Sequence, residues 1–369
     1  MKPILFNFSD PELEKFLIEM GQPKFRAKQI REWLNRGAPN FASMKNIPET
    51  LRMDLDKIAQ TLPVNIVKKL ESSDGETTKF LLELQDGEQI ECVLMRTTYG
   101  NSVCVSSQAG CAMGCKFCAS TLLGLKRNLT PNEIFAQVLV AQWELRSDRV
   151  SDKPIRPNGD ANNGDVSHIV IMGTGEPLQN TENVICFIER ANHDLGIGWR
   201  RITLSTCGIV DGIDRLIEWN RPINLAISLH APTDELRSQI MPINNRYNLG
   251  EVLDAAWRFT DNHNRQLMIE YILLGKKSDN GETILYNATP EYAEKLSELL
   301  RGKNCMVNLI PWNAVDERDF ASLSGNAVHR FQDILIKNGI HTRIRRERGT
   351  DIGSACGQLR LNNAKNKKA

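Results

Sequence analysis

Strand-like and helix-like segments alternate from residue 102 to residue 345 of this 369-residue chain. Apolar segments typical of buried strands occur at 102–106, 167–172, 201–206, 223–229, 267–274, 305–310 and 340–345. Amphipathic segments with helical periodicity lie between them, at 131–146, 181–195, 211–219, 234–240, 248–263, 290–301 and 325–338. This alternation predicts an α/β fold in which crossover helices join parallel strands, either in a barrel or in a doubly wound sheet.

The residues before this region have a different pattern. Ser9-Asp10-Pro11 is typical of a helix start, and we expect three helices between residues 10 and 60. The second of them, at 24–34, has a basic face that is either solvated or contacts phosphate. Short strands with turns between them follow at 64–96. We therefore expect four parts: a helical accessory domain at 1–62, a β-hairpin linker at 63–98, the α/β core at 99–348 and a C-terminal tail at 349–369.

Composition excludes several classes of protein. Hydrophobic residues make up 41% and charged residues 25% of the chain, which is typical of a globular protein and not of a disordered or collagenous one. No apolar run approaches the roughly 20 residues of a membrane span, so we expect a cytoplasmic protein. The net charge of +1 means that a nucleic-acid partner would have to be bound by a local basic patch.

Three of the nine cysteines lie within eight residues, at Cys111, Cys115 and Cys118. An odd number of cysteines in an intracellular chain argues against a disulfide framework. Three thiolates on one loop could hold a 4Fe-4S cluster and leave one iron without a protein ligand. The alternatives are a zinc site completed by Cys104 or Cys356, and a chance cluster of cysteines. The loop follows the first strand of the β/α series, where barrels place their active sites.

The spacing C-x3-C-x2-C, with the aromatic Phe117 before the last cysteine, resembles the signature of the radical S-adenosylmethionine (SAM) superfamily. The sequences at the ends of later strands extend this resemblance to the dual-specificity 23S rRNA/tRNA adenine-C2 methyltransferases. These sequences are Gly173–Pro177, Ser205-Thr206, Ser228–Ala231, Asn308–Asn313 and Gly349–Leu359. The resemblance covers nearly the whole chain and implies a partial (β/α)6 radical-SAM barrel.

The same resemblance implies two cofactors and the residues that bind them. Cys111, Cys115 and Cys118 would hold the 4Fe-4S cluster, and SAM would bind the remaining iron. Gly175 and Glu176 would meet the SAM amino group and nearby backbone. The rest of the SAM site would be lined by Ser205, Ser228, Leu229, His230 and Asn313. Read alone, His230 would be a core histidine and Ser205 and Asn313 would be ordinary turn residues.

Three further residues would carry the chemistry that the resemblance implies. Cys356 would take a methyl group from one SAM. A 5′-deoxyadenosyl radical from a second SAM would then abstract a hydrogen atom from this S-methyl group. The carbon radical would add to adenine C2, Glu91 would accept the C2 proton, and Cys104 would release the product by forming a transient disulfide with Cys356. The simpler interpretations are an inert strand thiol for Cys104 and a solvated carboxylate for Glu91. We expect the other four cysteines to be packing residues: Cys92, Cys186, Cys207 and Cys305.

RNA contacts are expected on the basic helix at 24–34 and on the Arg-rich segment 341–348, where Arg343 and Arg345 would share one strand face. The resemblance also implies an electron donor such as flavodoxin, and we expect a monomer with no membrane contact. The main alternative is the sister adenine-C8 rRNA methyltransferase, associated with antibiotic resistance. Two other classes are an RNA-binding protein with a structural zinc and an electron-transfer protein, although the latter would need a fully ligated cluster.

Overall fold

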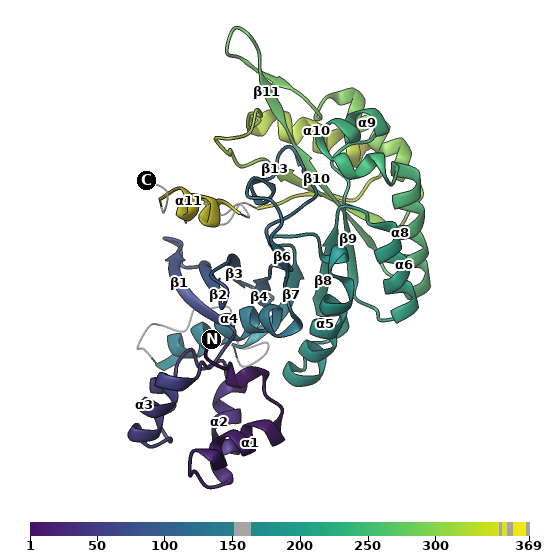
Figure 1. The fold of residues 1–369 in the computed structure, drawn as a ribbon. Helices are drawn as coiled ribbons and strands as arrows, with labels where there is room; N and C mark the ends of the chain where they lie inside the picture. The colour runs from purple at the N-terminus through teal and green to yellow at the C-terminus, as the bar shows by residue number, and fades with distance from the viewer. Residues whose placement is uncertain (151–163, 347–348, 353–356, 367–369) are drawn as a thin grey trace.

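A ten-stranded sheet organises the computed structural model, which describes residues 1–150, 164–346, 349–352 and 357–366 (Figure 1). The strand order is β1-β2-β3-β4-β7-β8-β9-β10-β13-β14. The pairs from β1 to β4 are antiparallel, and every pair from β4 to β14 is parallel. The strand bounds are β1 Val64–Glu71, β2 Thr77–Leu84, β3 Gln89–Thr97, β4 Gly100–Cys104, β7 Val166–Ile171, β8 Ile202–Thr206, β9 Asn224–Ser228, β10 Leu267–Leu273, β13 Cys305–Pro311 and β14 Thr342–Ile344.

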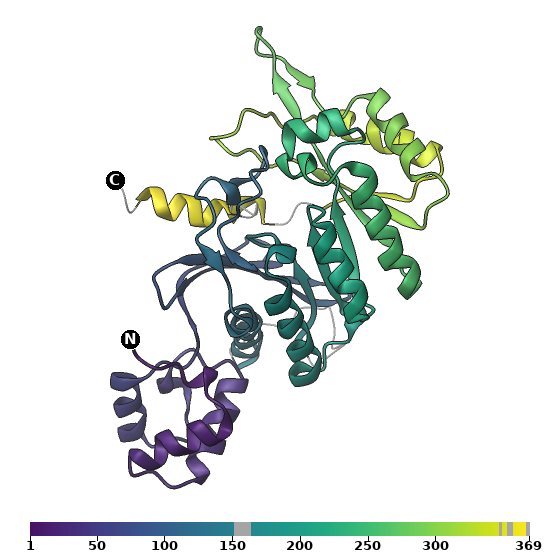
Figure 2. The ribbon, with the colours of Figure 1, turned by 45° about the vertical axis from the view of Figure 1, so that its right-hand side comes forward.

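Helices follow the parallel strands and cover the outer face of the sheet (Figures 1 and 2). Each of β4, β7, β8, β9, β10 and β13 is followed by helix, so the predicted α/β class and partial (β/α)6 barrel are confirmed. In α5, for example, Val184, Phe187 and Ile188 are fully buried, which stabilises the fold by about 2 kcal/mol for each side chain. The helix bounds are α4 Pro131–Val150, α5 Thr181–Leu195, α6 Val210–Trp219, α7 Asp234–Ile240, α8 Leu249–His263, α9 Pro290–Leu300 and α10 Gly325–Lys337.

Three helices precede the sheet, as the sequence predicts: α1 Asp10–Glu19, α2 Phe25–Asn35 and α3 Glu49–Ile58. A capping box in which Ser9 and Glu12 satisfy each other's backbone N–H groups begins α1. Phe25, the first residue of α2, is 57% exposed, and the Arg26 guanidinium lies over its ring. This helical region packs against the barrel helix α4, where the ring centroids of Trp33 and Trp143 lie 6.3 Å apart.

Two elements were not expected from the sequence. A short hairpin of β11 (Gly275–Lys277) and β12 (Thr283–Leu285) projects beyond the barrel (Figure 1). The predicted C-terminal tail includes helix α11, Gln358–Asn366, which packs against β3 (Figures 1 and 2). In the described chain, no helix has both the length and the apolarity needed to cross a membrane.

Candidate active site

Three polar side chains lie on one face of the sheet where its antiparallel part meets its parallel part. Lys79 in β2 is opposite Val93 in β3, and Val93 is opposite Cys104 in β4. Glu91 lies two residues before Val93 on the same strand. Because opposite residues share a face and a strand has a period of two, Lys79, Glu91 and Cys104 lie on the same face. The sheet thus brings together two of the predicted catalytic residues.

The cysteine loop follows β4 and is closed by a two-stranded ladder of β5 (Gln108–Ala109) and β6 (Arg127–Asn128). Gly110 has a φ of +90°, and a Cβ there would lie 1.8 Å from the Gly124 carbonyl oxygen. Only glycine can therefore begin this loop.

The three predicted cluster ligands differ in burial. Cys111 and Cys115 are each 8% exposed, and Cys118 is half-buried. Burial raises the pKa of the Cys111 thiol to about 12 and raises the pKa of Cys115 well above its ordinary value. Negative charge on Cys118 adds to both shifts, so the three thiols interact electrostatically. A positively charged iron centre would reverse this repulsion, because a metal favours the thiolate form.

The backbone of the cysteine loop is held by contacts from two other parts of the barrel. The Lys116 N–H donates to the carbonyl oxygen of Ile240 in α7 at 2.9 Å. After β13, the Trp312 indole N–H donates to the Phe117 carbonyl oxygen at 3.1 Å, and the Arg318 guanidinium donates to that of Cys118 at 2.6 Å. The loop is therefore fixed through its peptide groups.

The donor set fits a cluster bound by three cysteines, although its side chains are not yet in ligand geometry. Among the residues that the structure describes, no three His, Cys, Asp or Glu side chains already form a metal-binding group. Cys111, Cys115 and Cys118 nevertheless share one short loop and influence one another's ionisation. Closing around a cluster would require their side chains to turn toward a common centre.

A cavity of about 180 Å³ opens at the carboxyl ends of the strands. Five of the seven residues predicted for SAM line it: Gly175, Glu176, Ser205, Ser228 and His230. Leu229 instead has a buried side chain, and its N–H donates to the Glu270 carbonyl oxygen. Asn313 is half-buried and is not among the lining residues. The remaining lining residues are Ile171, Met172, Gly173, Cys207, Glu270, Ile310 and Arg345.

Glu176 joins two of the strand-end loops. One carboxylate oxygen accepts hydrogen bonds from the Thr206 hydroxyl at 2.7 Å and the Leu178 N–H at 3.0 Å, and the other accepts from the Cys207 N–H at 2.8 Å. Burial raises the pKa of Glu176, and these hydrogen bonds oppose the shift. The side chain therefore organises the loop after β8, and its contact with SAM stays a prediction.

His230 links the end of β9 to the cysteine loop. Its backbone is left-handed, with a φ of +61°, and its Nδ1 accepts a hydrogen bond from the Ile272 N–H. The ring packs edge-to-face on Phe117, with ring centroids 4.9 Å apart. Burial, aided by the nearby Arg237, lowers the pKa of His230 to about 3. The imidazole is thus neutral at physiological pH.

Three charged residues near the site were missed in the sequence. Arg237 in α7 is fully buried and donates to the carbonyl oxygens of Cys207 and Leu229. Glu270 lines the cavity, and burial raises its pKa against the opposing charge of Arg345. Arg318 holds the cysteine loop. Only Glu270 had a sequence signal, because it is the single charged residue in an otherwise apolar strand.

The other predicted residues have mixed outcomes. Cys92, Cys207 and Cys305 are buried, as expected of packing residues, but Cys186 is exposed, so that part of the prediction is wrong. Cys186 lies on the solvent side of α5, where helical periodicity places it away from the core. Arg345 follows β14 and lines the cavity, while Arg343 in β14 is exposed. Cys356 lies outside the described residues.

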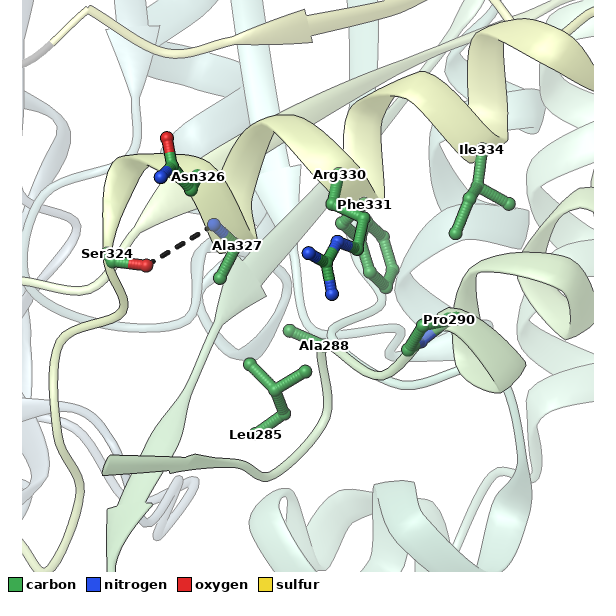
Figure 3. Close-up of a pocket in the computed structure, with 9 residues that line it drawn as sticks. All are labelled: Leu285, Ala288, Pro290, Ser324, Asn326, Ala327, Arg330, Phe331 and Ile334. Atoms are coloured by element: carbon green, nitrogen blue, oxygen red, sulfur yellow. Dashed lines mark hydrogen bonds between the residues drawn. The ribbon is translucent and has the colours of Figure 1, made fainter. Parts of the chain in front are cut away.

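A second cavity, of about 220 Å³, lies between β12, the start of α9 and α10 (Figure 3). Among the described residues that line it, Arg330 is the one with an ionisable side chain, and none is a predicted site residue. Ser324 caps α10 at its rim by accepting a hydrogen bond from the Ala327 N–H. Five of the predicted site residues line the smaller cavity instead, so that cavity is the candidate site.

Comparison with a solved structure defines the class of the protein. The radical SAM methyltransferase from Sphaerobacter thermophilus is 39% identical, with a TM-score of 0.79 over 96% of this chain and 98% of that one. The strand-end cavity and the three-cysteine loop lie on a fold shared with that enzyme, and the class is therefore radical SAM methyltransferase.

Curated relatives narrow this class. Probable dual-specificity RNA methyltransferases RlmN from Clostridium acetobutylicum and Clostridium tetani are each 44% identical, and the alignments cover 97% and 98% of this chain and 97% of each relative. Residues 4–61 match the ribosomal RNA large subunit methyltransferase N-terminal domain. The chain belongs to the RlmN family of dual-specificity RNA methyltransferases.

Proposed function

We propose that the protein methylates C2 of adenosine in 23S rRNA, at the peptidyl-transferase centre, and in the tRNA anticodon loop. The observation that carries this proposal is the shared sheet face of Glu91 and Cys104 beside the cysteine loop. An adenine that reached this face would have to leave its stack, as other bases do when enzymes modify them.

The proposed cofactor site combines the cysteine loop with the strand-end cavity. Cys111, Cys115 and Cys118 would hold a 4Fe-4S cluster, and Gly175, Glu176, Ser205, Ser228, Leu229, His230 and Asn313 would surround SAM. When bound, the cluster and SAM would supply the one-electron chemistry that an unactivated aromatic carbon requires. The neutral His230 ring and the Glu176 hydrogen bonds would position the loops around them.

The proposed protein chemistry uses two cysteines and one carboxylate. Cys356 would carry the methyl group, and Glu91 would accept the proton from C2. The Cys104 thiolate would then attack the sulfur of Cys356, so that a sulfur–sulfur bond forms as the carbon–sulfur bond to the product breaks. The departing carbon keeps the electron pair of that bond and takes up a proton, which completes the methyl group. Gly357, which follows Cys356 in the chain, lies against Ser120 just after the cysteine loop. That position supports a role for Cys356 near the cluster.

The division into parts at 1–62, 63–98, 99–348 and 349–369 belongs to the same proposal. RNA would be bound by the basic face of α2 and by the exposed Arg343 and its neighbours, with phosphate contacts that weaken as salt rises. The enzyme would act in the cytoplasm as a monomer and receive electrons from a flavodoxin-like donor.

The test is anaerobic reconstitution with iron, sulfide, SAM, a reductant and a 23S rRNA fragment, followed by mass spectrometry of the nucleosides. The expected product is 2-methyladenosine, and the Cys356→Ala variant should give none. Methylation at C8 would instead assign the sister activity, and a colourless zinc protein would overturn the radical mechanism.

A further inference from the structure

The Glu91 carboxylate caps the N-terminus of α11. Its Oε1 accepts a hydrogen bond from the Arg360 N–H at 2.6 Å, and its Oε2 accepts one from the Gly357 N–H at 2.9 Å. These are the N-cap and N3 amides of the helix, which otherwise have no intrahelical partner. A carboxylate suits this place because it also interacts favourably with the helix dipole. Here the cap comes from a strand 266 residues away along the chain.

Lys79 holds this carboxylate from the other side. Its Nζ lies 2.9 Å from Glu91 Oε2, and the two side chains are 1% and 4% exposed. A buried carboxylate stays charged only where opposite charge and hydrogen bonds compensate for lost hydration. Lys79 provides that charge from the neighbouring strand β2.

More contacts dock α11 on the same edge of the molecule. The Arg360 guanidinium pairs with Glu88 at 3.0 Å, and the Asn363 amide donates to Gln89 at 2.8 Å. Gly357, with a φ of +84°, approaches so closely that a Cβ would lie 2.7 Å from the Ser120 hydroxyl oxygen. The helix is therefore seated between β3 and the segment that follows the last cluster cysteine.

This arrangement conflicts with proton transfer to Glu91. Both carboxylate oxygens accept hydrogen bonds from α11, and one also pairs with Lys79. A base must come within hydrogen-bond distance of the proton that it removes. Gly357 and Arg360 lie against the two oxygens, so withdrawal of the N-terminus of α11 would open Glu91 to adenine C2.

We propose that Lys79 and Glu91 form an exchangeable latch for α11, in which the Glu91 carboxylate either docks the helix or faces the RNA base. This inference rests on the function proposed above. In the docked state Lys79 and the two amides share the carboxylate. In the RNA-bound state only Lys79 still contacts the carboxylate. The C2–H bond breaks, the proton passes to a Glu91 oxygen, and the electron pair of the bond stays in the adenine ring. Lys79 is a positioning residue, because it acts through Glu91.

Hydrogen exchange of the full-length, cluster-loaded protein tests the docked state. Glu91→Ala and Lys79→Met should each speed exchange in the peptide that contains 357–363 by about tenfold or more, since two charge-assisted hydrogen bonds are lost or weakened. Lys79→Arg should restore protection. The control is Lys68→Met, an exposed lysine on β1, which should leave exchange unchanged. Equal protection of α11 in all variants would overturn the latch.

The exchange between the two states needs its own measurement. Adding the 23S rRNA fragment to the parent protein should lower protection of the same peptide by about tenfold, and unchanged protection would show that α11 stays docked. This readout needs no turnover, so it remains decisive even if no methyladenosine forms and the proposed function fails.

Arg360→Met covers the case in which the strand variants do not fold, because it breaks the Glu88 pair and leaves Lys79 and Glu91 in place. It should loosen α11 about tenfold without slowing single-turnover methyl transfer from pre-methylated protein to RNA. Lys79→Met should slow that transfer at least tenfold. If Arg360→Met slowed the transfer equally, α11 would be needed in its docked form and the exchange would be excluded.

Discussion

The cysteine loop and the Glu91 latch lie close together but are held in opposite ways. The cysteine loop is held by hydrogen bonds between its peptide groups and Ile240, Trp312 and Arg318. Glu91, in contrast, is held by hydrogen bonds and an ion pair to its side-chain carboxylate. We infer that the predicted cluster ligands are positioned through their backbone, which leaves their side chains available to the cluster. Glu91 instead holds α11 with its carboxylate, so it must change hydrogen-bond partners before it can act as a base.

Removal of one predicted cluster ligand should have the largest effect of the variants considered, and it should affect iron binding without affecting the structure of the loop. Cys115→Ala should reduce iron from about four atoms per chain to almost none and abolish methylation. Because other residues fix the loop backbone, the melting temperature of the metal-free protein should change by only a few degrees. Iron analysis and calorimetry on the same sample check both parts. A large loss of stability in the metal-free protein would break the comparison.

Arg237→Met should have the largest effect on folding. Removal of the guanidinium leaves the carbonyl oxygens of Cys207 and Leu229 and the Asn244 amide oxygen without their buried donor. The expected loss is about 3 kcal/mol in the free energy of unfolding, measured by urea denaturation. Arg258→Met, which removes an exposed pair with Asp214, is the control and should cost about 0.5 kcal/mol or less.

His230 predicts a pH dependence. The folded pKa of about 3 lies below the unfolded value of 6.5, so only the unfolded state binds a proton between these values. The contribution of the neutral His230 ring to stability is therefore fully present above pH 6.5. The free energy of unfolding should fall by about 2 kcal/mol on going to pH 5. His230→Asn, which tolerates the left-handed backbone, should remove this slope. Parallel stability curves for the two proteins would contradict the assignment.

Arg318→Ala should have the smallest effect. The substitution removes a hydrogen-bond donor to the Cys118 carbonyl oxygen and should lower the free energy of unfolding by about 1 kcal/mol. The cluster should still form but release iron to a chelator a few times faster. Arg330→Ala, at the unrelated cavity, should release iron at the parent rate. If both variants behaved alike, the backbone contact would be irrelevant to cluster retention.

The sequence predicted the parts of the molecule that depend on local pattern. Alternating segments predicted parallel strands joined by helices. Residues at strand ends, such as Ser205 and His230, line one cavity because those ends share an edge. Arg237, Arg318 and α11 could not be predicted in the same way. Their partners lie far away in the chain, as with Arg318 and Cys118, which are 200 residues apart. The role of Lys79 was hidden because a lysine in a short strand is normally solvated.

The docking of α11 beside Ser120 affects when this face of the protein becomes covered during synthesis. Strands β2 and β3 and the cysteine loop leave the ribosome long before α11, because Gly357 follows Glu91 in β3 by 266 residues. Domains begin to fold during synthesis, from the N-terminus onward. The face beside Ser120 therefore stays uncovered in the nascent chain until α11 has been made, which would leave the proposed cluster site open to iron and sulfide. We therefore expect access to the proposed cluster site to be widest before α11 docks.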